Sequence, residues 1–331
     1  MAAENEVSPL RLQFAAAPYL ALPTTRRIRA ELAIEIAERA YPPDLTDLKR
    51  DWVASVAAPA FAALARDRPA EKRRSFCSIG TGTGVDALAA IEILGAQRIA
   101  VTDLFEDVVA AAVANIRANL ADGVRIDLTA AAGDLLSPLP DDAPPFDVIY
   151  ENLPNLPVAD ADVVAVGRSS GAHLAPRAET VPEFVEKNHL TLHWLALTSA
   201  RARLAPDGVV LSTIGSRVPL AALVKMSKSA GFAARPFTFG WKLQADADTL
   251  IATHADHQQR GFGPFHFYAA DRLAAVFAGL DTQAAGARAF ELEAALGAHA
   301  LDAATAWQAH RRGVAIGHTF VVLASNLESA P

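Results

Sequence analysis

The chain has 331 residues, of which 52% are hydrophobic and 20% are charged. This composition supports a large buried core and excludes general disorder. The net charge of −7 argues against a nucleic-acid partner, because such proteins normally carry a basic surface. The single cysteine, Cys77, excludes a disulfide framework and cysteine-rich zinc sites, and it is expected to be a core thiol.

Residues 1–72 are predicted to form an N-terminal helical cap. One helix is expected over RRIRAELAIEIAERAY, where Ile28, Leu32 and Ile36 recur at helical spacing. A second helix is expected over residues 44–67, and no strand is expected before residue 75. Neither a signal-peptide pattern nor an apolar run of membrane-spanning length is visible. We therefore expect a cytoplasmic protein with a small-molecule substrate and no membrane partner.

Residues 73–245 are predicted to form an α/β core. Short apolar runs that predict strands occupy residues 75–79, 98–103, 124–131, 146–150, 208–214 and 234–241. Helical patterns separate several of them, at residues 85–95, 105–120, 182–204 and 220–231. Strands that alternate with helices predict a mainly parallel sheet with right-handed crossovers.

Residues 246–312 are predicted to form a helical insert, and residues 313–331 a last core strand with a polar tail. The last apolar run, at 316–325, most simply returns to the same sheet as a seventh strand. We expect the insert and the N-terminal helices to lie over the carboxyl edge of the sheet and to exclude water from a site there.

A glycine-rich loop follows the first predicted strand of the core. In FCSIGTGTGVDAL, the run ends at Ile79 and the segment Gly80–Gly84 leads into a helix. Glycine permits unusual dihedrals and close approach of a ligand to the backbone, and the free N–H groups of a helix N-terminus favour negative charge. Alone, such a turn could bind a dinucleotide, S-adenosylmethionine (SAM) or nothing.

Acidic residues follow the next two predicted strands. Asp103 lies about 20 residues after the loop, the distance at which a carboxylate can accept hydrogen bonds from ribose hydroxyls. Asp134 follows the third strand, and YENLPNLP, residues 150–157, follows the fourth. Ligands of open parallel sheets bind outside the carboxyl ends of the strands, so these features predict a ligand site at that edge.

In order and spacing, these motifs resemble those of the class I SAM-dependent methyltransferases. The resemblance covers roughly residues 75–215 and implies a Rossmann-like fold with a seven-stranded, mostly parallel sheet. It implies SAM as cosubstrate or sole substrate, with Asp103 on the ribose and Asp134 on the adenine amino group. The other positions that it assigns to SAM binding are Gly80, Thr81, Gly82, Gly84, Leu104, Leu135 and Asn152.

The segment Asn152–Asn155 stands where amino-group methyltransferases of the family carry Asn-Pro-Pro-aromatic. This chain has Leu153 in place of the first proline and Asn155 in place of the stacking aromatic residue. It also has Ser78 where the family usually has an acid, two residues before the first glycine. The missing aromatic residue disfavours a flat target group such as a nucleobase and favours an aliphatic amine.

The chemistry of amine alkylation suggests roles for the residues around this turn. An amine nucleophile must arrive neutral, with its lone pair aimed at an activated carbon, and a side-chain amide oxygen can orient it by accepting N–H bonds. Asn152 is predicted for this role, with Asn155 as a second polar contact and Pro154 fixing the turn. Glu151 is a candidate base, or it pairs away from the site.

Three interpretations of the function remain open. The first is N-methylation of a small amine-bearing metabolite in secondary metabolism. The second is attack on the γ-carbon of SAM with release of methylthioadenosine, as in enzymes resembling isonocardicin synthase and azetidine-2-carboxylate synthases. The third possibility is a non-catalytic module that binds SAM and leaves it intact.

Other polar and aromatic residues are weaker candidates. Tyr19 and the aromatic loop at 261–268 could close over a sulfonium, and Arg168 could hold a carboxylate. His189 and His193 lie four apart in a predicted helix, as metal ligands can, but no third ligand is evident. No metal site is therefore predicted.

Overall fold

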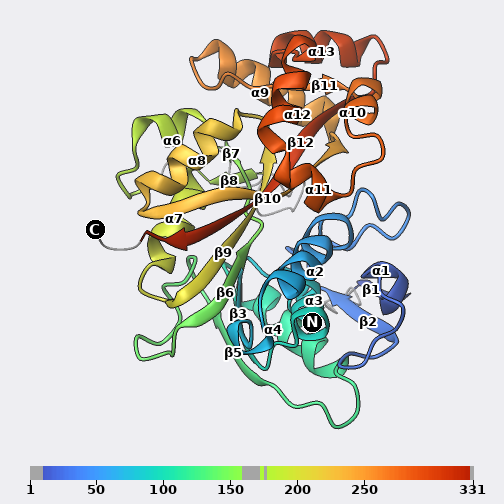
Figure 1. The fold of residues 1–331 in the computed structure, drawn as a ribbon, viewed down its shortest axis with the longest axis vertical. Coiled ribbons are helices and arrows are strands. Elements are labelled where there is room, and N and C mark those ends of the chain that lie inside the picture. Colours follow the sequence, from blue (N-terminus) through green and yellow to red (C-terminus); the bar gives the residue numbers. More distant parts are fainter. Residues whose placement is uncertain (1–9, 159–171, 175–176, 329–331) are drawn as a thin grey trace, which may run out of the picture.

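The computed structural model describes residues 10–158, 172–174 and 177–328. Its centre is one sheet with the strand order β10-β12-β9-β6-β3-β4-β5, and the short strand β11 pairs with β12 (Figure 1). β12 runs antiparallel to both of its neighbours, whereas the pairs from β9 through β5 are parallel. The predicted seven-stranded, mostly parallel sheet of a Rossmann-like methyltransferase fold is therefore confirmed.

Strands occupy β1 Leu10–Ala15, β2 Glu31–Ile36, β3 Ser75–Ile79, β4 Arg98–Asp103, β5 Asp127–Ala132, β6 Phe146–Glu151, β7 Leu156–Val158, β8 Ala172–Leu174, β9 Leu204–Ser216, β10 Phe232–Leu243, β11 Tyr268–Ala269 and β12 Ile316–Leu327. Helices occupy α1 Ala16–Tyr19, α2 Ala58–Asp67, α3 Val85–Ala89, α4 Glu106–Ala118, α6 Glu183–Lys187, α7 Thr191–Ala200, α8 Leu220–Ser229, α9 Ala247–Gln259, α10 Ala270–Val276, α11 Thr282–Ala287, α12 Ala289–Leu296 and α13 Ala303–Arg311. π-Helical turns at Val53–Ala57 and Ala90–Leu94 adjoin α2 and α3. Among the described residues, no helix is long and apolar enough to cross a membrane.

The prediction of a helix over residues 26–41 is wrong, because β2 occupies this stretch and pairs antiparallel with β1. Leu32, Ile34 and Ile36 are buried, whereas the residues between them are exposed or partly exposed. Ile28, Leu32 and Ile36 are four apart, a spacing that fits both a helical period and an alternating strand. Ile34 lies on the buried face with them only in a strand.

Asn115 of α4 and Asn119, the residue that follows this helix, bind the backbone of β2. Asn115 accepts from the amide of Glu35 at 2.8 Å and donates to its carbonyl at 2.8 Å. Asn119 makes the same pair of bonds with Ala33, at 2.8 and 2.9 Å. These amides satisfy backbone groups that a neighbouring strand would otherwise have to bind. The hairpin therefore docks beside α4, away from the position over the carboxyl edge predicted for the N-terminal region.

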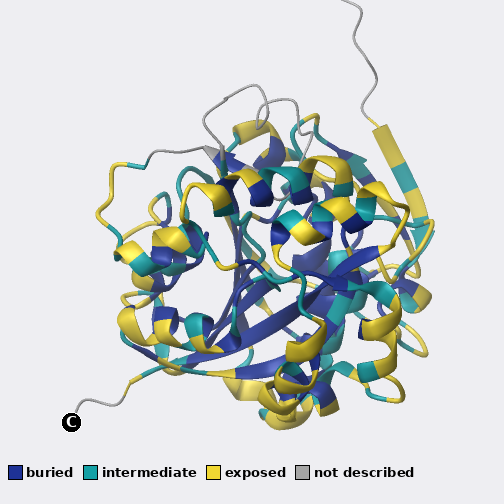
Figure 2. Cartoon of the chain, turned by 90° about the horizontal axis from the view of Figure 1, so that it is seen from above, coloured by how far each residue is buried: buried dark blue, intermediate teal, exposed yellow. Residues whose placement is uncertain are grey.

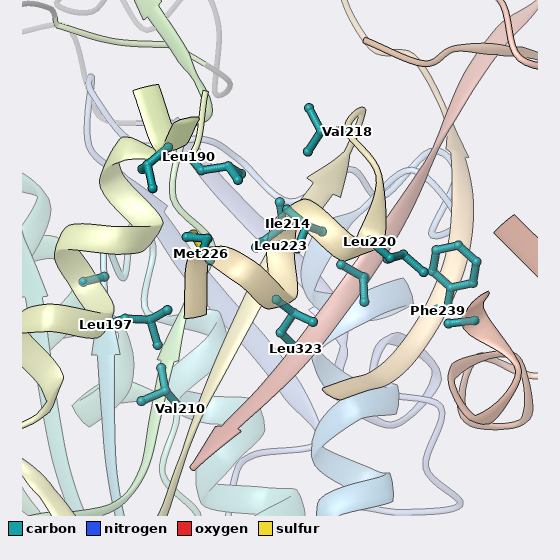
Figure 3. Packing of buried hydrophobic residues seen from close by; sticks show 14 of the residues in the cluster. Leu190, Leu197, Val210, Ile214, Val218, Leu220, Leu223, Met226, Phe239 and Leu323 are labelled. Atoms are coloured by element: carbon teal, nitrogen blue, oxygen red, sulfur yellow. The ribbon is translucent and has the colours of Figure 1, made fainter. Parts of the chain in front are cut away.

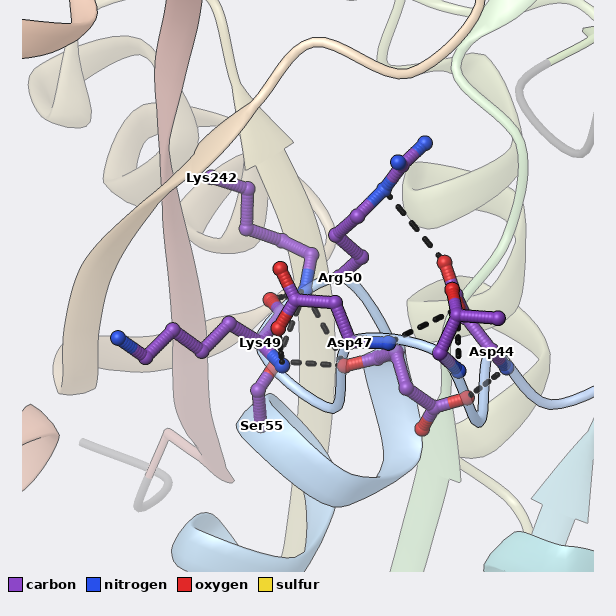
Figure 4. Close-up of polar contacts among 8 residues, drawn as sticks. Asp44, Asp47, Lys49, Arg50, Ser55 and Lys242 are labelled. Atoms are coloured by element: carbon purple, nitrogen blue, oxygen red, sulfur yellow. Dashed lines mark hydrogen bonds and ion pairs between the residues drawn. The ribbon is translucent and has the colours of Figure 1, made fainter.

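The segment between β2 and α2 does reach the carboxyl edge, where Lys242 at the end of β10 binds it (Figure 4). The Lys242 ammonium donates to the Lys49 carbonyl at 2.8 Å, the Asp51 carbonyl at 3.1 Å and the Ser55 hydroxyl at 2.7 Å. It also lies 4.9 Å from the centre of the Trp52 ring. Burial lowers the pKa of Lys242 to about 8. All three ammonium donors are used, so Lys242 has a structural role.

Lys242→Met is expected to lower the free energy of unfolding by about 1–3 kcal/mol, because it leaves three acceptors without their donor while it keeps the apolar stem. Urea unfolding followed by circular dichroism measures this loss. Lys228→Met, at an exposed position of α8, is the matched control and should change little. Equal stability of the two variants would contradict the role assigned to Lys242.

The predicted insert contains α9 to α13 and the strand β11, which pairs with the start of β12. The loop between α9 and β11 is hydrogen-bonded to segments at the carboxyl edge. The His266 amide donates to the Arg217 carbonyl at 2.7 Å, and the Gly263 amide donates to the Lys187 carbonyl at 2.7 Å. Another part packs on the sheet: a Cβ at Gly286 in α11 would lie 2.3 Å from the Phe237 carbonyl oxygen in β10. The insert thus covers the edge and one flank of the sheet.

The core has two parts, one on each face of the sheet. Cys77 and Ile149 belong to one cluster, and their neighbours Phe76 and Tyr150 belong to the other, as strand alternation requires. The central strands β3, β6, β9 and β12 are buried along most of their length (Figure 2). Figure 3 shows the first cluster where α8 lies on β9 and β12. Cys77 is a buried free thiol, as predicted.

Candidate functional site

The register of the sheet brings the predicted motifs to one edge. Ile79 pairs with Glu151 in β6, so Gly80 and Asn152, the next residues of the two strands, lie side by side. Asp103 pairs with Ala132 at the end of β5. The Leu153 side chain would lie 3.1 Å from a Cβ at Gly80, so the turn after β6 packs directly on the glycine loop.

The glycine loop has the backbone conformation that only glycine adopts readily. Gly80, Gly82 and Gly84 have φ values of 68°, 54° and 79°. A Cβ at Gly84 would lie 3.1 Å from the Ala112 carbonyl oxygen, which explains this glycine by packing against α4. A Cβ at Gly82 would meet nothing within 4 Å. Space is therefore open at Gly82, as a ligand that approaches the backbone requires.

Asp103 lies at this open space, where its carboxylate accepts from the Gly82 amide at 3.0 Å. Burial raises its pKa. The neighbouring Leu104 has an exposed fraction of 56%, which leaves an apolar surface beside the carboxylate. Thr81 is buried and donates to Asp86 at 3.0 Å, so its hydroxyl serves the loop itself.

Asp134 is already engaged in an ion pair. Arg177 donates to both of its carboxylate oxygens, at 3.0 and 2.7 Å, and also binds Glu179. A cavity beside this pair is lined partly by Leu135 and Leu195. A ligand amino group that binds Asp134 must therefore share the carboxylate with Arg177 or displace it.

A carboxylate that sequence reasoning missed lies under the loop. Asp86, in the first turn of α3, accepts from the hydroxyls of Ser78 and Thr81 and is 5% exposed. Ser78 at the end of β3 thus donates to a carboxylate that the following helix supplies. Burial raises the pKa of Asp86 to about 6. The feature of the sequence that could have identified Asp86 is its place as an acid in the first turn of the helix after the glycine loop.

The raised pKa of Asp86 predicts a pH dependence of stability. The folded state holds its proton up to about pH 6, whereas the unfolded carboxyl has a pKa of 3.8, so the unfolding free energy should fall as pH rises between these values. The fall should reach at most about 3 kcal/mol. Asp86→Asn should lack it, and Asp122→Asn, at an exposed acid, should keep it in urea unfolding at several pH values. Parallel pH profiles of wild type and Asp86→Asn would contradict the assignment.

Glu151 and Asn155 are joined through a buried histidine of α7. His193 Nδ1 lies 2.9 Å from both carboxylate oxygens of Glu151, and both side chains are fully buried. Asn155 Nδ2 lies 3.1 Å from His193 Nε2 and donates to the His189 carbonyl at 3.3 Å. Because the carboxylate only accepts, Nδ1 carries the proton and Nε2 accepts from Asn155. Glu151 therefore acts on His193, from a position without solvent contact.

This arrangement orients the two amides of the turn. Asn155 Nδ2 has two acceptors, which leaves its Oδ1 free among the described residues to accept an N–H. Asn152 is partly buried, and its side chain makes no hydrogen bond within the described part of the chain. Pro154 is also partly buried between them. Two amide oxygens are thus available beside the glycine loop.

Tyr19 does not join this group. Tyr19 is 2% exposed, and its hydroxyl donates to Asp51 at 2.7 Å, so it offers no free polar group. Burial raises its pKa. Arg168 lies outside the described residues.

The premise that His189 and His193 share one helix is wrong. His189 precedes α7 and has a φ of 55°, a left-handed conformation that is uncommon outside glycine. His193 alone lies in the helix and faces Glu151. His189 Nε2 instead lies 2.9 Å from His257 Nδ1 in the insert. The two histidines therefore belong to different contacts.

Residues 61–156 match the family model described as "Ribosomal protein L11 methyltransferase (PrmA)". This stretch, less than a third of the chain, includes the glycine loop, both acids of the edge and the turn after β6. No curated protein matches the chain. Together with the mostly parallel sheet of this chain, the match supports one conclusion. The fold is that of the class I methyltransferases.

Several solved structures are similar. The ribosomal protein L11 methylase from Lactobacillus delbrueckii subsp. bulgaricus has 17% identity over 56% of this chain and 69% of that chain, with a TM-score of 0.33. The YcgJ protein from Bacillus subtilis has 15% identity over 82% of this chain and 99% of that chain, with a TM-score of 0.41. The [4+2]-cyclase SpnF has 16% identity over 82% of each chain, with a TM-score of 0.37.

Proposed function

We propose that this protein is a SAM-dependent transferase that methylates a small amine-bearing metabolite. The main observation behind the proposal is the pair of amide oxygens on Asn152 and Asn155, which have no hydrogen-bond donor among the described residues and lie in the turn whose Leu153 packs on Gly80. Open space at Gly82, the Asp103 carboxylate and the exposed Leu104 fit the ribose and adenine of SAM. SAM supplies a methyl group activated by its sulfonium.

The residues of the chain act mainly by positioning. Asn152 and Asn155 accept N–H bonds from the substrate amine and direct its lone pair, a proximity effect. His193 holds the Asn155 amide with its oxygen outward, and Glu151 fixes the tautomer of His193. The nitrogen forms the new bond to carbon, and the bond electrons of the broken carbon–sulfur bond remain on sulfur. The amine then releases its extra proton to solvent.

A second candidate is attack on the γ-carbon of SAM, by an external nucleophile or by SAM's own amine. The observation that favours it is the neutral, hydrogen-bonded amide at Asn155, where a stacking aromatic residue would suit a planar acceptor. The buried pair Glu151–His193 holds this amide in place. Extra helices over the carboxyl edge also suit a small enclosed substrate.

One incubation separates the two reactions. The protein is mixed with SAM alone, and the nucleoside products are followed by mass spectrometry. For methyl transfer we expect SAM to persist until an amine acceptor is added and S-adenosylhomocysteine then to form. Methylthioadenosine formed from SAM alone, together with azetidine-2-carboxylate and faster than without the protein, would establish ring closure. Binding of SAM with no turnover under any amine panel would instead support the non-catalytic module.

A further inference from the structure

A second polar pocket adjoins the turn after β6, on the side of the insert. It lies where the end of β9 meets the segment before α7, and Asn155 forms part of its wall. Its other polar lining includes His189, Arg217 and His254, and Phe265 of the insert closes one side. Asn155 thus belongs both to the turn after β6 and to the wall of this pocket.

Arg217 provides the positive charge of the pocket. Its Nε and Nη2 donate to the Gln244 side-chain oxygen at 2.9 and 2.7 Å, and Nη1 donates weakly to the Gly215 carbonyl at 3.4 Å. A guanidinium has five N–H donors. One N–H on each Nη therefore remains unused, a pair that matches the two oxygens of a carboxylate. A Cβ at Gly215 would lie 2.8 Å from Nη1, so glycine makes room for the guanidinium.

No counter-ion balances Arg217 within the described residues. Its partner Gln244 is neutral, and burial without a compensating acid lowers the pKa of Arg217 to about 10. Even a partly buried cation is costly without an anion, so such a position is unusual in a purely structural role. Gln244 also donates to the Ala245 carbonyl at 2.7 Å, which fixes the oxygen that faces Arg217.

The histidines of the pocket are neutral and add a free ring nitrogen. Burial, together with the Arg217 charge, lowers the pKa of His254 to about 3, and burial with neighbouring histidines lowers that of His189 to about 2. His189 Nδ1 is buried and has no hydrogen-bond partner in the described chain. The left-handed backbone of His189 ends α6, because the His189 amide donates to the Glu186 carbonyl and the Leu190 amide to the Val185 carbonyl, each at 3.0 Å.

We propose that this pocket binds the carboxylate of an amino-acid group, with Arg217 as its principal donor and His189 as a secondary contact. This rests on the proposed function and narrows its substrate class. The amine of the same group would then lie at Asn155, between Arg217 and the glycine loop. The carboxylate belongs either to an amino-acid acceptor or to the methionyl part of SAM.

The binding test uses acetate as the probe and acetamide as its neutral match, without SAM. Histidine ring resonances are followed by NMR during each titration. We expect saturable shifts with acetate only, in the wild type and in the control Arg260→Met, which changes an exposed arginine of the insert. Arg217→Met should weaken acetate binding at least ten-fold.

Gln244→Glu is a second variant, for the case that Arg217→Met loses acetate binding only because it is misfolded. It places a carboxylate against Arg217, so it supplies a counter-ion inside the fold and should also weaken acetate binding at least ten-fold. Thermal unfolding should show that this variant remains folded. Acetate binding that is unchanged in Arg217→Met, or acetamide binding as strong as acetate binding, would overturn the proposal.

Calorimetry with SAM and methylthioadenosine then identifies the source of the carboxylate, since only SAM carries the amino-acid group. If SAM supplies it, Arg217→Met should weaken SAM at least ten-fold and leave methylthioadenosine unchanged. If an acceptor supplies it, both affinities should persist, and turnover should favour amino acids over their amides in the wild type only. A wild type that binds acetate through Arg217 but does not bind SAM would refute the proposed function alone.

Discussion

Asn152→Ala is expected to reduce turnover about 100-fold, the scale on which one positioned hydrogen-bonding group acts in catalysis. Asn152 follows the end of β6 next to Gly80, and its amide has no partner among the described residues. Removing it leaves the substrate amine without one acceptor and releases no strain in the fold. SAM affinity, measured by calorimetry, should fall far less than turnover because the glycine loop and Asp103 remain.

Asn326→Ala is the matched control for this experiment. Asn326 donates to the Gly208 carbonyl at 2.7 Å near the end of β12, which lies at the opposite edge of the sheet. This variant should lose some stability and keep its turnover. Full turnover in Asn152→Ala would exclude the role assigned to the turn after β6, in either of the two candidate reactions.

Gly82→Asn should lower SAM affinity at least 100-fold. Asparagine tolerates the left-handed conformation of Gly82 better than most residues, and a Cβ there meets no protein atom within 4 Å. The fold should therefore accept the change. The new side chain would instead occupy the space beside Asp103 in which we place the ribose of SAM, and calorimetry measures the loss.

Gly123→Asn controls for backbone strain alone. Gly123 has a φ of 80° and equally open surroundings, but it lies in the loop between α4 and β5. Both variants should show similar unfolding midpoints, and only Gly82→Asn should lose SAM. Equal SAM affinity in the two variants would place the cofactor elsewhere.

The core of the fold could be predicted because its signals are local. Each strand from β3 to β12 that builds the main sheet, apart from the short β11, carries a short apolar run, and glycine or polar residues end several of them. The loop at Gly80–Gly84 is recognisable because the turn requires positive φ values at three positions. Asp103 follows at a spacing that the βαβ unit sets.

The N-terminal region could not be predicted in this way. Its apolar residues fit two periods, and the choice between them depended on β1, which supplies the partner strand, and on Asn115 and Asn119, which bind the free edge. The two asparagines lie 80 or more residues from the strand residues that they bind. A hairpin alone is marginal in water, so its docking site decides whether it forms.

The chain's own sequence determined the sheet, the glycine loop and the acids and amides at its carboxyl edge, because strand periodicity and loop dihedrals are properties of neighbouring residues. Only the tertiary structure decided how Asn155 is oriented, because its partner His193 lies in α7, which is distant in sequence from the turn after β6. It also brought Asp86 against Ser78 under the glycine loop and left Arg217 beside Gln244 without a counter-ion among the described residues. Charge balance and hydrogen-bond pairing depend on residues that are distant in sequence, and no local pattern reports them.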